Sequence, residues 1–248
     1  MQTSITKERR TKKPSAQSTS KNHAPRQSVN KDHLALKEGF NALTEGQRQM
    51  MFAMKEGMNV VAHGSAGTGK SYCAINHALV ELFSRKTKKI VIVRSAVASR
   101  DLGFLPGSLE EKADPYKIPY KQLINQMCAN GTAWDVLTKK EMVEFITTSY
   151  VRGITLDDCI VIVDEFQNAN VQEIYSVLTR VGENCQVILL GDTKQTDLNK
   201  RKEESCFDWL LNVTQKMPNW FDVIHFYPQD ICRSGFCKEL ILTVEGLM

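Results

Sequence analysis

Eight residues beginning at Gly64 constrain this chain more than any other stretch. They match the pattern G-x-x-x-x-G-K-[ST] at every fixed position. A short apolar run at 58–62 comes before them, and residues 72–83 carry apolar side chains at helical spacing. A strand, a glycine-rich loop and a helix in this order form the context in which the pattern binds phosphate. We therefore expect a nucleotide site built on a P-loop.

The residue types in this loop suit ATP and Mg²⁺. Glycines let the backbone N–H groups turn toward phosphate oxygens, and the following helix adds the positive end of its dipole. Lys70 is expected to reach the β and γ phosphates, and the Ser71 hydroxyl is expected to hold Mg²⁺. Upstream, the Gln47 amide is a weaker candidate for pairing with the adenine edge. The predicted loop residues that bind ATP are Gly64, Ser65, Ala66, Gly67, Thr68, Gly69, Lys70 and Ser71.

Continuous apolar runs at 89–94, 159–163 and 186–190 predict strands buried on both faces. Helical patterns alternate with them, which predicts an α/β fold: a mainly parallel sheet with helices on both faces. The carboxyl ends of its strands then meet along one edge, where ligands bind. A further strand is expected at 145–150. Residues 95–143 are rich in Gly and Pro, and we expect them to be irregular apart from short helical pieces at 120–127 and 133–137.

Polar residues follow two of these strands. Asp164 is placed to hold Mg²⁺ through water, and Glu165 to polarise the attacking water, which favours hydrolysis over transfer to a substrate hydroxyl. Gln195 follows the next strand and is a candidate for orienting that water and sensing the γ-phosphate. A solvated strand end and an ordinary polar turn stay open as alternatives for these positions.

Charge divides the chain into two regions. Residues 1–33 carry eight Lys or Arg and two acidic residues, whereas the remainder carries 24 basic and 26 acidic residues. The overall charge of +4 therefore comes from the first 33 residues. We expect a disordered basic tail at 1–33 and a folded domain at 34–248. The tail is either an inert leader or an arm that contacts nucleic acid.

Cysteine usage indicates the compartment. Seven cysteines occur without Cys-x-x-Cys pairs, which favours buried thiols over a zinc site and a reducing compartment, the cytoplasm. The sequence shows neither a secretory signal nor an apolar run of bilayer length, so we expect no membrane partner.

The order of short motifs between about residues 43 and 242 resembles the PhoH-like family of ATPases, whose core is similar to that of superfamily one helicases. This resemblance implies ATP hydrolysis, a RecA-like core, assembly into a ring of six and a link to single-stranded RNA. We expect no nuclease domain. Ser95, Ile154 and Ser234 depart from the family pattern. The motifs are Thr44-Glu45-Gly46-Gln47, residues 64–71, Arg94, Gly103-Phe104-Leu105-Pro106-Gly107, Asp114-Pro115-Tyr116, Arg152-Gly153, Asp164-Glu165-Phe166-Gln167-Asn168, Leu178-Thr179-Arg180-Val181-Gly182, Gly191-Asp192 with Gln195-Thr196-Asp197-Leu198, and Asp230-Ile231-Cys232-Arg233.

Arg233 is a candidate arginine finger, which would stabilise charge on the transferred phosphoryl group. The chain has one core, so a finger would most simply come from a neighbouring subunit; a surface salt bridge is the alternative. The leading hypothesis is an Mg²⁺-dependent ATPase coupled to single-stranded RNA. A small-molecule kinase on the same loop and an ATP-gated scaffold with little turnover are the rivals.

Overall fold

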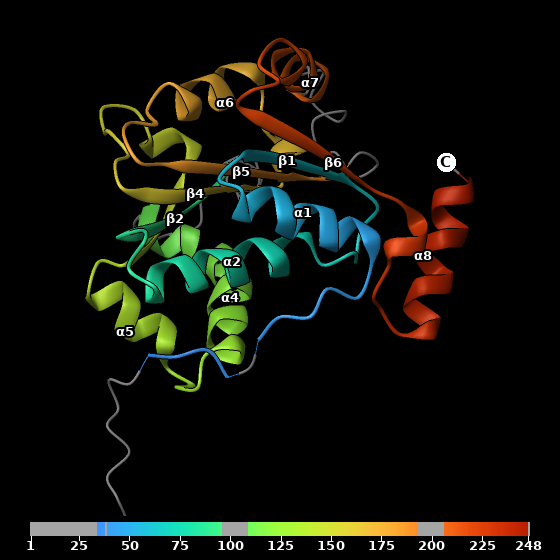
Figure 1. Ribbon diagram of the computed structural model, residues 1–248, viewed down its shortest axis with the longest axis horizontal. Helices are drawn as coiled ribbons and strands as arrows, with labels where there is room; N and C mark the ends of the chain where they lie inside the picture. Colours follow the sequence, from blue (N-terminus) through green and yellow to red (C-terminus); the bar gives the residue numbers. More distant parts are fainter. Residues whose placement is uncertain (1–33, 38, 96–108, 193–205, 248) are drawn as a thin grey trace, which may run out of the picture. The chain divides into compact units, whose positions relative to one another are not determined.

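The computed structural model describes residues 34–37, 39–95, 109–192 and 206–247. Its centre is a six-stranded sheet in the order β3-β2-β4-β5-β1-β6 (Figure 1), in which every neighbouring pair of strands is parallel. The predicted mainly parallel sheet is therefore confirmed. The strands are β1 Asn59–Gly64, β2 Lys89–Arg94, β3 Val143–Thr147, β4 Cys159–Asp164, β5 Gln186–Gly191 and β6 Phe221–Phe226.

Helices cover both faces of the sheet, as predicted for an α/β fold of the P-loop class. Figure 1 shows α1, α2, α4 and α5 on one side and α6 and α7 on the other. The α-helices are α1 Glu45–Lys55, α2 Lys70–Phe83, α4 Leu109–Met127, α5 Ala133–Lys139, α6 Val171–Leu178, α7 Phe207–Lys216 and α8 Gly235–Leu247. Three short 3-10 helices are described, η1 Thr148–Tyr150, η2 Phe166–Asn168 and η4 Pro228–Asp230.

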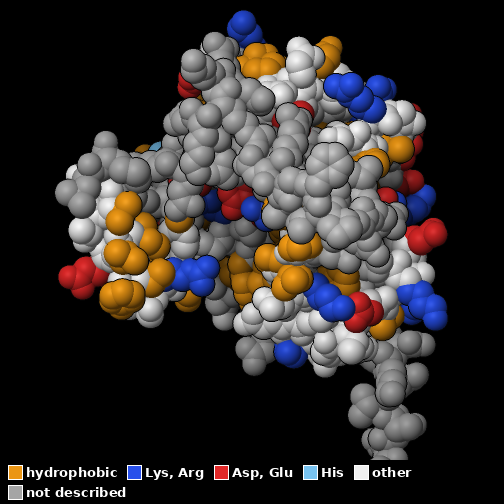
Figure 2. Space-filling model, turned by 180° about the vertical axis from the view of Figure 1, so that it is seen from behind, with side chains coloured by type: hydrophobic (Ala, Val, Ile, Leu, Met, Phe, Trp, Pro, Cys, Tyr) orange, Lys and Arg blue, Asp and Glu red, His pale blue; other side chains and the backbone are white. Residues whose placement is uncertain are grey.

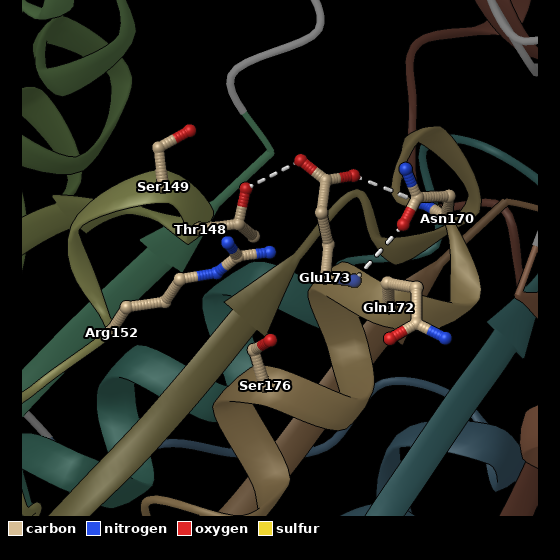
Figure 3. Close-up of a pocket in the computed structure, with 7 residues that line it drawn as sticks. All are labelled: Thr148, Ser149, Arg152, Asn170, Gln172, Glu173 and Ser176. Carbon is tan, nitrogen blue, oxygen red and sulfur yellow. Dashed lines mark hydrogen bonds between the residues drawn. The ribbon is translucent and has the colours of Figure 1, made fainter.

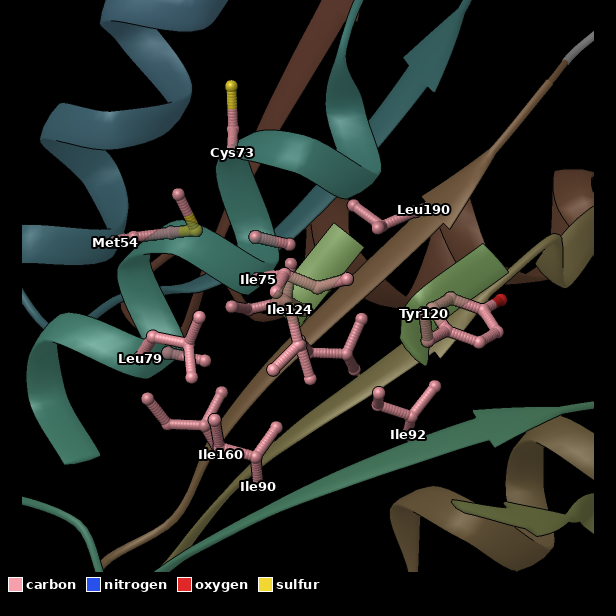
Figure 4. Close-up of a cluster of buried hydrophobic side chains, with 14 of the residues drawn as sticks. Met54, Cys73, Ile75, Leu79, Ile90, Ile92, Tyr120, Ile124, Ile160 and Leu190 are labelled. Carbon is pink, nitrogen blue, oxygen red and sulfur yellow. The ribbon is translucent and has the colours of Figure 1, made fainter. Parts of the chain in front are cut away.

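The central strands are apolar at consecutive positions because both of their faces are buried. On β2, Ile90 and Ile92 join the core under α1, α2 and α4, whereas Val91 and Val93 join the core under α6 and α7. Figure 4 shows the first of these cores, where Ile90 and Ile92 lie with Leu79 of α2. Each fully buried aliphatic side chain contributes about 2 kcal/mol from the hydrophobic effect. These cores fix the sheet that carries the loops.

The expectation of an irregular segment is wrong for residues 109–119, which continue the predicted helical piece at 120–127 into the single helix α4. Pro115 and Pro119 lie inside it. Both prolines are exposed and lie one helical turn apart, and each removes one hydrogen bond of the helix. Tyr120 and Ile124 lie on the buried side of the same helix. Burial of that apolar side offsets the cost of the two prolines, which the local sequence alone does not show.

The strand expected at 145–150 also differs from the structure. β3 covers Val143–Thr147, and Thr148–Tyr150 form the 3-10 helix η1. The buried Thr148 hydroxyl donates to Glu173 on α6 at 2.7 Å. This bond to another element holds the chain at the end of β3, where it turns out of the sheet.

One edge of the sheet collects the carboxyl ends of all six strands. The helix α8 follows β6 at this edge and carries exposed apolar side chains, among them Phe236 and Leu240 (Figure 2). Its Ile241 lies near Gly67, within 3.4 Å of where a Cβ on that glycine would be. No described helix is both long and apolar enough to cross a membrane. The predicted tail at 1–33 lies outside the described residues.

Candidate functional site

The predicted phosphate loop lies between β1 and α2. Gly67 and Gly69 adopt φ values of 72° and 85°, which side-chain-bearing residues rarely adopt. Gly69 is the N-cap of α2, and no side chain caps this helix in the described structure. The N–H groups of the first turn of α2 therefore open onto the loop. This arrangement is suited to an anion, because the helix dipole also favours negative charge there.

The Lys70 ammonium group lies inside this loop. Its Nζ donates to the carbonyl oxygens of Ser65 at 2.7 Å and Gly64 at 3.1 Å, and to the Thr68 hydroxyl at 3.3 Å. It also stands 5.7 Å from the centre of the Phe226 ring on the neighbouring strand β6. The ammonium group is thus held among the backbone groups that form the loop, as a phosphate-binding lysine requires.

The end of β4 meets the start of α2. The Ser71 hydroxyl donates to the Asp164 carboxylate, at 3.1 Å to Oδ2 and 3.3 Å to Oδ1. Asp164 is only 7% exposed. A hydroxyl and a carboxylate that converge at the phosphate loop are oxygen ligands of the kind that Mg²⁺ prefers. The residues present therefore fit the cation that the fold implies.

Tyr120 on α4 is a third member of this cluster. Its hydroxyl donates to Asp164 Oδ2 at 2.8 Å. Burial, followed by the nearby Asp164 charge, raises the pKa of Tyr120 well above its ordinary value. The phenol therefore stays protonated and acts as a donor, while Asp164 accepts. Local sequence gives no signal for this role, because it predicts only that Tyr120 begins a short helical piece.

Glu165 is turned toward the site by its backbone. Its φ of 56° and ψ of 41° are left-handed, so the chain leaves the strand direction directly after Asp164. Burial first, and then repulsion from Asp164, raises the pKa of Glu165. A carboxylate with a raised pKa is a stronger base, which suits a group that takes a proton from water. Adjacent residues of a strand point to opposite faces of the sheet, and this turn allows Asp164 and Glu165 to face the same site.

Gln167 connects two strand ends. Its Nε2 donates to Glu165 Oε2, and its Oε1 accepts from the Asp192 N–H at 2.9 Å. The side chain is only 2% exposed. Gln167 therefore fixes the Glu165 carboxylate relative to the end of β5. Its place in the run Asp164-Glu165-Phe166-Gln167-Asn168 was the available signal, but that run did not indicate this bridge. Gln195, the other predicted glutamine, lies outside the described residues.

Gln47 is buried beneath the loop. Its Nε2 donates to the Thr68 carbonyl at 2.9 Å, and its Oε1 accepts from the Leu43 N–H at 2.8 Å. The amide therefore ties the segment before α1 to the phosphate loop. Its pairing with an adenine edge stays a prediction.

Arg233 lies beside the phosphate loop of its own chain. A Cβ built on Gly67 would come within 2.8 Å of Arg233 Cγ, so the two residues are in close contact. The Cys232 N–H donates to the Gly67 carbonyl at 3.1 Å and fixes the backbone there. Asp230 anchors the same segment, because its carboxylate accepts from the Gly46 N–H at 3.2 Å and the Tyr227 N–H at 2.9 Å.

Two histidines lie side by side near the carboxyl ends of the neighbouring strands β1 and β6. His63 Nδ1 and His225 Nδ1 are 3.3 Å apart, so at least one ring must be neutral to share a hydrogen bond. Burial, then His225 and then Lys70 lower the pKa of His63 to about 4. The end of β1 therefore carries a neutral His63, near the Lys70 ammonium group, at neutral pH.

Comparison with known proteins identifies relatives. A protein-family model described as PhoH-like protein matches residues 40–245. A PhoH-like protein of Bacillus subtilis (strain 168) is 43% identical over 203 residues, which are 80% of this chain and 61% of that protein. Protein PhoH of Escherichia coli (strain K12) is 31% identical over 202 residues, which are 81% of this chain and 56% of that protein. The chain thus matches little more than half the length of these relatives.

Solved structures are similar at a greater distance. The ATPase core of Sulfolobus solfataricus SWI2/SNF2 in complex with dsDNA has a TM-score of 0.42 at 10% identity, covering 77% of this chain and 47% of that one. The Pif1 helicase from Candida albicans has a TM-score of 0.38 at 16% identity, covering 76% of this chain and 40% of that one.

Proposed function

The chain belongs to the PhoH-like protein family, and from this we propose that it is an ATPase that binds ATP with Mg²⁺ and hydrolyses it. The observation that carries the proposal is the contact between the Ser71 hydroxyl and the Asp164 carboxylate beside a complete phosphate loop. Glu165 supports it, because its raised pKa suits a base directed at water.

Each side chain has a separate task in the proposed reaction. The loop N–H groups bind phosphate oxygens, and Lys70 balances charge on the β and γ phosphates. Ser71 and Asp164 would hold Mg²⁺, which supplies further neutralisation of phosphate charge when bound. Glu165 accepts the proton of the attacking water, and Gln167 keeps its carboxylate in place. Gln195 is proposed to orient the same water.

Arg233 is proposed to act on the phosphates of its own subunit. Its contact with Gly67 of the same chain supports this role and differs from the expectation of a neighbour's arginine. A guanidinium there would stabilise charge that develops on the transferred phosphoryl group. Assembly into a hexamer rests on the family resemblance, and the exposed apolar side chains of α8 are suited to a subunit contact.

Coupling to single-stranded RNA is the second part of the proposal. It rests on the family resemblance, with the eight basic residues of the first 33 as support. A cytoplasmic location accords with the seven cysteines, all of which are free thiols in the structure. We propose these partners only for the part of the longer PhoH-like relatives that this chain matches.

Phosphate release with and without single-stranded RNA tests the proposal against its rivals. An RNA-coupled ATPase releases phosphate from ATP at a basal rate and faster with RNA. A kinase releases little inorganic phosphate with or without RNA, because it transfers the phosphoryl group to an acceptor and forms ADP only when that acceptor is supplied. A scaffold binds ATP and forms little ADP or phosphate under either condition. The Lys70→Ala chain is the control for contaminating activity. A wild-type rate equal to that of this control would contradict the ATPase assignment.

A further inference from the structure

A polar pocket of about 240 Å³ lies between η1 and α6 (Figure 3), and no residue of the phosphate loop lines it. η1 follows the carboxyl end of β3, and α6 follows that of β4. The pocket is therefore at the same edge of the sheet as the candidate ATP site. Its lining is almost entirely side chains that carry hydrogen-bonding groups, including Ser149, Arg152, Gln172 and Ser176. Such a lining suits a polar ligand rather than an apolar one.

Arg152 is the positive charge of this pocket. Figure 3 shows its side chain reaching across the pocket toward Thr148 and Glu173. Arg152 is exposed and makes no hydrogen bond or ion pair within the part of the chain that the structure describes. A guanidinium group offers five N–H donors in a planar fork that matches phosphate oxygens. Arg152 is therefore available to a phosphate that enters from solvent.

The one carboxylate in the pocket is already engaged by the protein. Glu173 accepts from the Thr148 hydroxyl at 2.7 Å, from the Asn170 N–H at 3.0 Å and from the Ser95 hydroxyl at 3.3 Å. Figure 3 shows the first two of these bonds. Three donors spread the negative charge of Glu173, so that it opposes an incoming phosphate less than a free carboxylate would. Its role is to hold η1 against α6.

Exposed aromatic side chains occur on both elements that border the pocket. Tyr150 belongs to η1 and is 49% exposed, and Tyr175 belongs to α6 and is 54% exposed. Tyr150 lies two residues before Arg152 in the chain and does not line the pocket itself, whereas the Tyr175 ring meets Trp209 of α7 edge to face. Proteins bind single strands by combining exposed rings, on which bases stack, with positive charge that meets the backbone. Bases in a duplex are already stacked on one another and offer no free face.

We propose that this pocket binds the sugar–phosphate backbone of a single-stranded nucleic acid, with Arg152 on a phosphate group and Tyr150 stacked against a base. The inference rests on the proposed coupling of ATP hydrolysis to RNA and gives that coupling a location on the chain. The hydroxyl and amide groups of Ser149, Gln172 and Ser176 supply further donors for phosphate or ribose oxygens.

The pocket is also connected to the proposed metal site. Ser95, which donates to Glu173, directly follows Arg94, and Arg94 is the register partner of Asp164 across β2 and β4. If nucleotide binding moves Asp164, the movement would pass to Arg94 on the neighbouring strand and then to Ser95. Ser95 contacts Glu173, which lines the pocket. Through this connection, a bound single-stranded nucleic acid could influence ATP hydrolysis.

The test is the binding of a fluorescent single-stranded oligoribonucleotide and the matching oligodeoxyribonucleotide to the full 248-residue chain over a range of salt concentrations. The variant is Arg152→Gln, and the matched control is Arg85→Gln. Arg85 is an exposed arginine that follows α2, at the opposite edge of the sheet. Both variants lose one positive charge, so that a change in net charge alone affects them equally. Thermal melting checks that both are folded.

We expect Arg152→Gln to weaken binding about tenfold and to reduce the salt slope by about 0.7, the value for one phosphate contact of a single strand. Tyr150→Ala is expected to weaken binding about tenfold with an unchanged salt slope, because stacking involves no ion release. Equal losses on both oligonucleotides would assign the contact to phosphate, and a larger loss on RNA would add the ribose. If Arg152→Gln binds the oligonucleotides as strongly as Arg85→Gln does, the proposed role of the pocket is overturned. Absence of wild-type binding to either strand instead overturns the proposed RNA coupling itself.

Discussion

The Ser71 hydroxyl lies 3.1 Å from a carboxylate oxygen of Asp164, although 93 positions separate the two residues. Ser71 comes from the first turn of α2, and Asp164 is the last residue of β4. A parallel sheet brings these two points together, because the strands before and after each crossover end at the same edge. The Tyr120 hydroxyl, from α4, completes the cluster on the same carboxylate.

Replacing Lys70 by Ala is expected to abolish ATP turnover and to weaken ATP binding, because the ammonium group is the cation held inside the phosphate loop. Phosphate release and the binding of a fluorescent ATP analogue measure the two effects. Lys86→Ala is the matched control, since Lys86 is exposed and pairs with Glu81. Wild-type turnover in Lys70→Ala would remove the site assignment.

Replacing Tyr120 by Phe tests the buried hydrogen bond to Asp164. The ring stays packed in the core, but the carboxylate loses one donor, which is expected to lower the free energy of unfolding by about 1 kcal/mol. Urea unfolding of the chain measures this change. Tyr72→Phe, at a partly exposed tyrosine of α2, is the control and should change little. An equally small effect at Tyr120 would show that the bond contributes nothing to stability.

Stability is expected to fall as the pH drops below about 6.5 because of His63. Its pKa is about 4 in the folded chain and 6.5 in the unfolded chain, so protons bind more readily to the unfolded state between these values. The full effect is on the order of 3 kcal/mol. His63→Asn should flatten the dependence when unfolding is compared at pH 7 and pH 5. A variant that loses as much stability as the wild type over this range would contradict the effect.

Mixing two inactive chains distinguishes the possible sites of action of Arg233. Arg233→Ala is expected to lower turnover about 10³-fold if the guanidinium stabilises the transferred phosphoryl group. Because Arg233 contacts Gly67 of its own chain, a mixture with Lys70→Ala should regain no activity. Light scattering and tagged pull-down establish whether the two chains assemble together. Recovery in mixtures that do assemble would show that the arginine acts on a neighbouring subunit.

The phosphate loop and the order of strands and helices followed from local sequence. The apolar runs predict β2 and β4 to within a few residues of their observed bounds. The helical spacing after Ser71 does the same for α2. Bounds were less certain where a long-range contact decides them, as at Thr148, whose bond to Glu173 ends β3 early. Local sequence predicts the helical piece at 120–127 but not residues 109–119 of α4, because the prolines argue locally against a longer helix. Burial of Tyr120, which offsets them, depends on a sheet that is distant in sequence.

Local sequence indicates the candidate residues for Mg²⁺ and water, but not the residues that hold them in place. Asp164 and Glu165 could be found because they follow a run of buried β-branched residues. The roles of Tyr120 and Gln167 depend on which side chains meet across elements, and neither residue type carries a periodic signal for that. The position of Arg233 relative to Gly67 likewise depends on how the chain returns after β6, which the sequence does not encode locally.

The rate of phosphate release by Glu165→Gln, beside its affinity for ATP, tests the account most directly. The substitution keeps the size of the side chain and leaves Ser71 and Asp164 in place, so ATP should bind with unchanged affinity in the presence of Mg²⁺. Release should fall by about 10²–10⁴-fold, the usual contribution of a positioned general base. A Glu165→Gln chain that binds ATP and releases phosphate at the wild-type rate would contradict the assignment of this carboxylate as the base of an ATPase.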